Sequence, residues 1–385
     1  MSKQVRLGIV GLGVMGRVHA ANILAGKIPR LQLTAVADSA PGNLAKFKGV
    51  KKFGTFEAMA ASGLIDAVLI ATPHFLHTTL GIKALKAGLH VLVEKPVSVH
   101  KADAERLLAA HTRGDRVFAA MFNQRTDPFY LELRHLIRSG ALGEVRRVNW
   151  TITNWFRTGH YYASGSWRAT WAGEGVGILL NQCPHNLDLL QWMFGMPRRI
   201  RAFCNFGRYH DIEVEDDVTA YLEFANGATG TFIASTGEAP GTNRLEIAAE
   251  QGRVVVENDK LVFTRNEVPM SEFSRTADSS FAQPATKEIV IAPPNHGEQH
   301  NGILRNFTDA ILDGVPLIAP AAEGIHSVEL ANAMLLSSWT DQAVDLPIDA
   351  RFYAKKLRAK IARSKPKKRS KTVSRTEDFS KSFGR

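Results

Sequence analysis

The strongest chemical candidate lies in residues 90–99, which read HVLVEKPVSV. The apolar run VLV is typical of a strand that is buried on both faces, and Glu94 and Lys95 follow it at once. A charged pair at the end of a buried strand needs a partner or a purpose. An ammonium group beside a substrate hydroxyl can relay a proton and stabilise a developing alkoxide during hydride transfer. A surface ion pair is the alternative, and the residue types alone leave both interpretations open.

A glycine motif near the N-terminus predicts the cofactor that such a lysine would serve. G-x-G-x-x-G follows an apolar strand and precedes a helix pattern, so the helix N-terminus would face a pyrophosphate. Asp38 ends the next strand, where a carboxylate can bind the adenosine ribose and would repel a 2′-phosphate, with a loop cap as the alternative. NAD is therefore favoured over NADP. The expected contacts are Gly11, Leu12, Gly13, Val14, Met15, Gly16 and Asp38.

A third strand end contributes to the same region. The segment ATPHFLH (71–77) follows an apolar strand, and its small residues leave room for a cofactor near the switch point of the sheet. We expect Ala71, Thr72, Pro73 and His77 to line that space. His74 and His77 lie three apart, but no third ligand has a suitable spacing, so we expect no metal site.

Alternating strand and helix patterns over the first 125 residues must position these groups. Repeated β–α units of this length predict an α/β, Rossmann-type, doubly wound parallel sheet. The expected strands are 5–11, 31–38, 64–72, 90–94 and 116–122, and the expected helices lie near 15–25, 76–87 and 101–113.

From residue 126 the pattern changes to helices followed by a series of strands with short turns. Consecutive strands of this kind predict a C-terminal α+β domain with an open, mostly antiparallel sheet. Asn226 and Gly227 form a strong hairpin turn between two of the strands. A polar stretch at 268–299 predicts a long loop, and two late helices near 300–313 and 322–342 complete the domain.

The composition sets the domain count and the expected partners. A chain of 385 residues is too long for one ordinary core, so we predict domains over 1–125 and 126–350 and a tail over 351–385. The tail carries 14 Lys/Arg and two acids, net +12, so the other 350 residues sum to −1 despite an overall charge of +11. We expect a disordered, solubilising extension and no nucleic-acid partner.

Cysteine usage and hydropathy indicate the compartment. Cys183 and Cys204 form neither a disulfide framework nor a zinc spacing, which favours a reducing cytoplasm. No apolar stretch approaches the roughly 20 residues that cross a bilayer. The first residues lack the apolar core of a signal peptide. We therefore expect a cytoplasmic protein without a membrane partner.

Several motifs together resemble the glucose–fructose oxidoreductase/inositol dehydrogenase/MocA family. They are the glycine motif, EKP at 94–96, MFNQRTDP at 121–128, Trp167-Arg168 followed by a glycine-rich turn and a histidine, and DDVTAYLEFANGATGTF at 216–232. The resemblance runs from about residue 4 to residue 345. It implies a two-domain oxidoreductase of sugars, inositols or related polyols that uses NAD or NADP. It also implies a homodimer or homotetramer assembled through the sheet of the second domain.

The resemblance also assigns roles to individual residues. The family's catalytic lysine falls on Lys95 and its catalytic histidine on His185. The aspartate that is usual four residues before that histidine is replaced here by Asn181, so Lys95 would take a larger share of the proton transfer. Asp188, one turn after His185, would orient it or bind a sugar hydroxyl. The implied contacts are Glu94, Lys95, Asn123, Trp167 and Arg168 for the cofactor, Lys95, Arg125, Asn181, His185 and Asp188 for the substrate, and His300 for the pocket.

An aromatic cluster predicts the nature of the substrate. Four of the six tryptophans lie within 22 residues, at 150, 155, 167 and 171, interleaved with Phe156, Tyr161 and Tyr162. Flat rings with polar edges suit the C–H faces of a pyranose or inositol, although about half of them should build core instead. Arg157, His160 and Arg168 add hydrogen-bond donors. A neutral sugar, polyol or glycoside is the expected substrate.

Two other functions remain open. One is a glycosidase in which tightly held NAD oxidises the sugar transiently and so permits elimination of the leaving group. The other is a non-catalytic, cofactor-binding regulatory protein, which only the basic tail favours.

Overall fold

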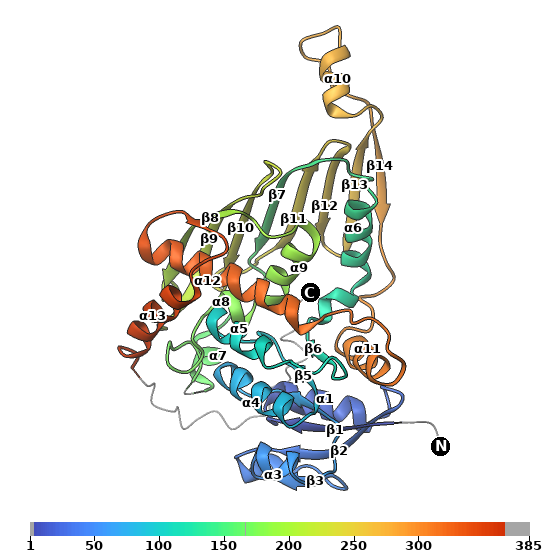
Figure 1. Ribbon diagram of the computed structural model, residues 1–385. Coiled ribbons are helices and arrows are strands. Elements are labelled where there is room, and N and C mark those ends of the chain that lie inside the picture. The colour runs from blue at the N-terminus through green and yellow to red at the C-terminus, as the bar shows by residue number, and fades with distance from the viewer. Residues whose placement is uncertain (1–3, 166, 366–385) are drawn as a thin grey trace.

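The computed structural model describes residues 4–165 and 167–365 (Figure 1). Six parallel strands form the first sheet in the order β3-β2-β1-β4-β5-β6. This order places β1 beside β4 at the switch point and confirms the predicted doubly wound sheet. The strands are β1 (Val5–Val10), β2 (Leu31–Ala37), β3 (Lys51–Phe53), β4 (Ala67–Ile70), β5 (His90–Val93) and β6 (Phe118–Ala120). The helices packed around them are α1 (Val14–Leu24), α2 (Pro41–Leu44), α3 (Phe56–Ala60), α4 (His74–Lys86), α5 (Lys101–Ala109) and, from late in the chain, α11 (His300–Asp313).

Nine strands form the second sheet in the order β14-β13-β12-β11-β7-β10-β9-β8-β15. Only the β7–β10 pair is parallel, as the prediction of a mostly antiparallel sheet required. The strands are β7 (Val145–Ile152), β8 (Arg199–Phe206), β9 (Glu215–Glu223), β10 (Thr229–Ser235), β11 (Asn243–Ala249), β12 (Gly252–Glu257), β13 (Lys260–Asn266), β14 (Thr286–Ile291) and β15 (Val344–Asp345). The helical segments are η1 (Asn123–Thr126), α6 (Pro128–Arg138), α7 (Gly159–Ala163), α8 (Ile178–Asn181), α9 (Pro184–Phe194), α10 (Met270–Thr276), η2 (Ala321–Glu323), α12 (Gly324–Thr340) and α13 (Ala350–Ile361).

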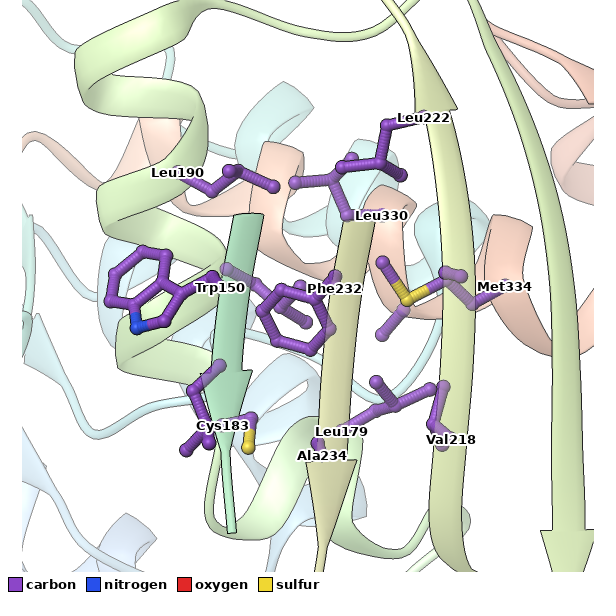
Figure 2. Close-up of a cluster of buried hydrophobic side chains, with 14 of the residues drawn as sticks. Trp150, Leu179, Cys183, Leu190, Val218, Leu222, Phe232, Ala234, Leu330 and Met334 are labelled. Atoms are coloured by element: carbon purple, nitrogen blue, oxygen red, sulfur yellow. The ribbon is translucent and has the colours of Figure 1, made fainter. Parts of the chain in front are cut away.

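The second core forms between this sheet and the helices α6, α9 and α12, which lie over one of its faces (Figure 1). Alternate residues of β9 and β10 are buried, as expected for strands with one covered face. Trp150 of β7 and Phe232 of β10 meet Leu190 of α9, and Leu330 and Met334 of α12 complete the cluster (Figure 2). This packing fixes α9, the helix that carries His185.

Helix α11 returns the chain to the first core. Its Ile303, Leu304 and Phe307 are buried among side chains of the parallel sheet. Nearby, the backbone N–H of Ala120 in β6 donates to the carbonyl of Ala319 at 3.0 Å. The first core therefore includes residues that lie far along the chain, inside the range predicted for the second domain. The hydrophobic pattern of a segment does not reveal that a late helix packs against the first domain.

The parallel sheet has β3 as a sixth strand that was not expected, and two later segments also differ from the sequence-based expectation. The predicted loop at 268–299 contains α10, which projects beyond the sheet (Figure 1), and β14, which pairs with β13. The predicted tail begins with α13, because Tyr353 and Leu357 bury apolar faces on the second core. The remainder of the predicted tail, from residue 366, lies outside the described residues. No helix within residues 4–165 and 167–365 is both long and apolar enough to cross a bilayer.

Candidate active site

Lys95 lies at the C-terminal edge of the parallel sheet and reaches the second domain. It follows β5, whose three valine and leucine residues are fully buried. Its Nζ donates to the backbone carbonyl of Asn181, the last residue of α8, at 2.9 Å. Burial lowers the pKa of Lys95, while the charges of Glu94 and Glu174 oppose that shift. The lysine is therefore held between the two domains.

Glu94 is anchored by a histidine. Nε2 of His19, on α1, lies 2.6 Å from Oε1 of Glu94, and both side chains are almost fully buried. Burial by itself raises the pKa of Glu94, but His19, His300 and Lys95 outweigh it and lower that pKa to about 2. The ionised carboxylate thus ties the helix after the glycine loop to the strand end that carries Lys95. The spacing of residues gave no sign of the His19–Glu94 pair.

His185 enters the same space from α9. It is the second residue of that helix and is 8% exposed. Its Nδ1 is buried without a hydrogen-bond partner among the described residues, and its ring packs edge-on against Phe122 at 6.2 Å between centroids. Burial lowers the pKa of His185 well below its usual value, and the charges of Lys95 and His300 lower it further. The imidazole is therefore neutral, within electrostatic reach of Lys95, and able to accept a proton.

The glycine loop has the shape that a dinucleotide phosphate requires. Gly11 has φ +89°, and a Cβ at Gly16 would lie 1.9 Å from the carbonyl oxygen of Gly11. A Cβ at Gly13, by contrast, would meet no atom within 4 Å. The first turn of α1 has no acidic residue and no side-chain cap. The open N-terminus of α1 therefore fits an anionic pyrophosphate.

Asp38 braces this loop. Its Oδ2 accepts a hydrogen bond from the backbone N–H of Leu12 at 2.7 Å, and its Oδ1 accepts one from Ala40 at 2.7 Å. Each oxygen keeps further acceptor capacity, because an ionised carboxylate offers about four lone-pair positions. The loop-cap role is thus present in the structure, and it leaves room for ribose hydroxyls. Val14 and Met15 follow in the first turn of α1 and are half-buried.

His77 links two segments that flank Lys95. Its Nδ1 lies 2.7 Å from the carbonyl oxygen of Pro96, and its Nε2 lies 2.8 Å from that of Thr72. The ring is 1% exposed, and burial lowers the pKa of His77. His77 therefore holds the segment after β4 against the segment after β5, and its predicted contact with the cofactor stays a prediction.

Two buried polar atoms near the sheet edge have no hydrogen-bond partner among the described residues. They are Thr72 Oγ1 and Asn123 Oδ1, while Asn123 Nδ2 donates to Gln299 Oε1 at 2.6 Å. The backbone N–H of Ala71 donates to the carbonyl of Val10, so Ala71 lies directly after the end of β4. Pro73 is exposed just before α4. The predicted cofactor-lining residues are thus brought to one edge of the sheet.

Trp167 and Arg168 reach the first domain from the second. Arg168 Nη1 donates to the hydroxyl of Tyr161 at 2.9 Å, and its guanidinium lies 4.8 Å from the centre of the Trp167 ring. Trp167 meets His74 edge-on, with 6.1 Å between ring centroids. Burial, together with the charges of His77, Lys95 and Arg168, lowers the pKa of His74 well below its usual value. His74, which the sequence gave only as a doubtful metal ligand, is therefore a neutral part of the cleft wall.

The aromatic cluster divides between core and site. Trp150 is fully buried and Trp171 is 6% exposed, so both belong to the second core. Trp155 and Tyr161 are half-buried, and the guanidinium of Arg157 stacks between them at 5.2 and 5.0 Å from the ring centres. The expectation that about half of these rings are structural agrees with this division.

Arg125 and Asp188 bind each other instead of facing the cleft. Arg125 Nε and Nη2 donate to the Asp188 carboxylate at 2.7 and 2.6 Å, and neither side chain is exposed. Nη1 of Arg125 donates to Ile318 and Glu323. Because a fully buried, bidentate pair uses the donors of the guanidinium, the predicted substrate contacts of Arg125 and Asp188 do not fit this arrangement. The pair instead fixes η1 against α9.

Two buried residues of the site were missed from the sequence. Glu174 lies in a glycine-rich turn and contacts the side chain of Asn181. His19 holds Glu94. A lone acid between glycines was the only sign of the first residue. Among the described residues, no group of three or more His, Cys, Asp or Glu side chains has an arrangement that could hold a metal ion.

The arrangement defines a class of protein: a two-domain oxidoreductase with a Rossmann cofactor domain, in which a lysine at the sheet edge contacts the segment of the second domain that leads to a buried histidine. Family models agree with both halves. Residues 5–122 match the oxidoreductase family with an NAD-binding Rossmann fold, and residues 130–255 match the GFO/IDH/MocA C-terminal domain. The chain therefore belongs to the GFO/IDH/MocA oxidoreductase family.

Curated relatives extend over almost the whole chain. Inositol 2-dehydrogenase of Rhizobium meliloti (strain 1021) is 26% identical over 349 residues, which is 86% of this chain and 96% of the relative. Levoglucosan dehydrogenase of Pseudarthrobacter phenanthrenivorans is 24% identical over 391 residues, covering 90% and 99%.

Solved structures share the fold. The WlbA dehydrogenase from Bordetella pertussis, in complex with NADH and UDP-GlcNAcA, superposes with a TM-score of 0.78 at 24% identity, covering 91% of this chain and 99% of that one. A levoglucosan dehydrogenase in complex with NADH gives 0.75 at 21% identity, covering 90% and 100%.

Proposed function

We propose that the protein is an NAD-dependent dehydrogenase that transfers hydride between the cofactor and a ring hydroxyl of a sugar, inositol or glycoside. The observation that carries this proposal is the contact of Lys95 Nζ with the Asn181 carbonyl, four residues before the buried His185, whose pKa the charge of Lys95 lowers. The named relatives are inositol and levoglucosan dehydrogenases, which favours hydride transfer over the glycosidase and regulatory alternatives.

Each residue has a defined task in this proposal. Bound NAD supplies the hydride acceptor. Gly13 and the N-terminus of α1 hold the pyrophosphate, Asp38 holds the adenosine ribose, and Thr72 and Asn123 offer buried polar atoms to the rest of the cofactor. The carboxylate of Asp38 favours NAD over NADP by charge repulsion of a 2′-phosphate.

The proton of the reacting hydroxyl leaves toward the neutral imidazole of His185, which is able to accept it. The ammonium of Lys95 donates a hydrogen bond to the oxygen of the same hydroxyl, and its positive charge stabilises the developing alkoxide. Tyr161, Trp155 and Arg157 would contact the sugar ring through their half-buried faces.

A polyol screen tests the proposal. Inositols, hexoses, anhydrosugars and glycosides are offered with NAD, and with NADP in parallel, while NADH formation is followed by absorbance. We expect turnover of at least one cyclic polyol with NAD and a weaker response with NADP. Cleavage of a glycoside with retained cofactor and no net NADH would contradict the dehydrogenase assignment.

The assembly and compartment are part of the same proposal. The face of the nine-stranded sheet away from α9 and α12 carries exposed rings, among them Phe203 at 57% and Tyr221 at 45% exposure. A homodimer or homotetramer formed through this face would bury them, which light scattering can test. Cys183 and Cys204 are free and buried, which suits a reducing, cytoplasmic location.

A further inference from the structure

Glu174 is a buried acid for which the proposed mechanism has no role so far. It lies in the turn between α7 and α8 and is 2% exposed. Its Oε2 accepts the N–H of Ala169 at 2.7 Å, and its Oε1 accepts from the side-chain amide of Asn181. A glutamine has one acceptor oxygen and could satisfy only one of these two donors. Because burying a carboxylate is costly, its charge calls for a nearby cation.

The turn that carries Glu174 is pressed against the first domain. A Cβ at Gly175 would lie 2.4 Å from Val99 Cγ1 and 2.8 Å from the Phe75 ring, and the backbone of Gly175 has φ +83°. His74 of α4 makes a hydrogen bond to the backbone of Glu174. The carboxylate is therefore held at a fixed place in the interface between the domains, where Lys95 also lies.

Asn181 connects this carboxylate to Lys95. Its side-chain amide donates to Glu174, and its backbone carbonyl accepts from Lys95 Nζ at 2.9 Å. The hydroxyl of Tyr161 and the amide of Gln182 contact the Asn181 side-chain oxygen at 3.3 and 3.2 Å, so the amide cannot easily turn away. Burial lowers the pKa of Lys95, and the charges of Glu94, Glu174 and Cys183 oppose that shift in this order of size, while Arg157 adds to it.

We infer that Glu174 is a positioning residue: its bond to the Asn181 side chain holds the residue whose carbonyl receives Lys95 Nζ, and its carboxylate is a buried counter-charge for Lys95. The negative charge is carried by Glu174, which binds the Asn181 side chain, rather than by an aspartate at position 181. The role in catalysis rests on the proposed function of Lys95, whereas the electrostatic link between the two residues does not.

A direct titration of Lys95 tests the link without any substrate. The full-length protein is reductively methylated with a ¹³C label, the Lys95 signal is identified by its absence in Lys95→Met, and its chemical shift is followed with pH. We expect Glu174→Gln to lower the Lys95 pKa by on the order of one unit, the scale of a lost neighbouring charge. An unchanged Lys95 pKa in folded Glu174→Gln would overturn the inference.

A rescue and a control separate charge from simple support of the turn. The double variant Glu174→Gln/Asn181→Asp restores one carboxylate between position 174 and Lys95. Most of the lowering of the Lys95 pKa should then be reversed. Glu213→Gln removes another carboxylate that braces the same loop, through the N–H of Trp171 at 3.0 Å, and should leave the Lys95 pKa in place. Equal shifts in Glu174→Gln and Glu213→Gln would overturn the inference. If Glu174→Gln does not fold, Asn181→Asp alone must raise the Lys95 pKa, and an absent rise would overturn it.

Turnover gives the second measurement. With any polyol that the screen identifies, the limb of the pH–rate profile that reports Lys95 should move in Glu174→Gln by the same amount as the NMR titration. If no polyol is oxidised, the proposed function fails, while the titration still supports or overturns the link between Glu174 and Lys95.

Discussion

Lys95 Nζ and the carbonyl oxygen of Asn181 lie 2.9 Å apart, although 86 residues separate them in the chain. This contact uses the backbone carbonyl of Asn181 and leaves its side chain available for other partners. The asparagine side chain is thereby free to bind Glu174 and Tyr161. The two domains are thus joined at the group on which the proposed chemistry depends.

Removing the Lys95 amine should affect chemistry and spare cofactor binding. We expect Lys95→Ala to lower turnover at least ~100-fold, the scale of a lost acid–base group. NADH affinity, measured by fluorescence titration, should change little, because the loop that holds the phosphates is elsewhere. Lys83→Ala is the matched control, since Lys83 forms only an exposed pair with Glu57. Loss of NADH binding in Lys95→Ala with normal turnover at saturation would refute the assignment.

Alanine substitutions at two glycines of the motif should affect different properties, NADH affinity at Gly13 and folding stability at Gly16. Gly13→Ala adds a methyl group where no atom lies within 4 Å, and its φ of −63° suits alanine, so the fold should tolerate it. That methyl occupies the proposed pyrophosphate site, and NADH affinity should fall at least ~10-fold. Gly16→Ala places a Cβ 1.9 Å from the Gly11 carbonyl and should lower the free energy of unfolding by about 1–3 kcal/mol. Urea unfolding and fluorescence titration distinguish the two, and unchanged NADH affinity in Gly13→Ala would contradict the assigned site.

A buried ion pair joins α5 of the first domain to α12. Lys101 Nζ lies 2.6 Å from Glu329 Oε1 and 3.2 Å from the carbonyl of Ile348. Glu329→Ala leaves the ammonium buried without its counter-ion and should cost about 3–5 kcal/mol in urea unfolding. Asp66→Ala, which breaks the exposed pair with Arg6, should cost less than about 1 kcal/mol. Similar costs for both variants would show that the Lys101 pair is effectively solvated.

The contribution of Glu215 to stability should fall as the pH rises through the neutral range, whereas His74 and His185, whose pKa values burial lowers, act in the opposite direction below about pH 6.5. Burial raises the pKa of Glu215 from 4.5 to about 8, and its Oε1 accepts the N–H groups of Gly177 and Leu179. Between these pKa values the folded protein holds a proton that the unfolded chain has lost, so unfolding becomes easier with increasing pH. The loss from pH 4.5 to pH 8 should be on the order of 3–5 kcal/mol.

Glu215→Gln provides the comparison for that pH dependence. The amide keeps an oxygen for the two backbone donors and has no proton to release. Urea unfolding at several pH values should therefore show a flatter profile for the variant than for the native protein. Parallel profiles would mean that Glu215 does not titrate in this range.

Local patterns were sufficient for the parallel sheet and for part of the site. The strand around Leu92 is apolar throughout, and the glycine motif requires a tight turn between a strand and a helix. Lys95, Gly13 and Asp38 therefore follow the ends of parallel strands and could be assigned to one edge of the sheet from the sequence. The helix of Tyr353 was missed because a basic composition hides a narrow apolar face. The strand β14 was missed because most of its side chains are exposed.

By itself, the sequence determined most of the strands of the parallel sheet and the glycines that the loop requires, and it proposed Lys95 and His185 for proton transfer. The tertiary structure alone decided how the charged groups are paired: Arg125 with Asp188, His19 with Glu94, and Glu174 with Asn181 behind Lys95. The physical reason is that strand and helix patterns arise from neighbours within a few residues. The burial and pairing of charges depend on contacts between segments that are distant in the chain, and many such pairings are compatible with one pattern of residues.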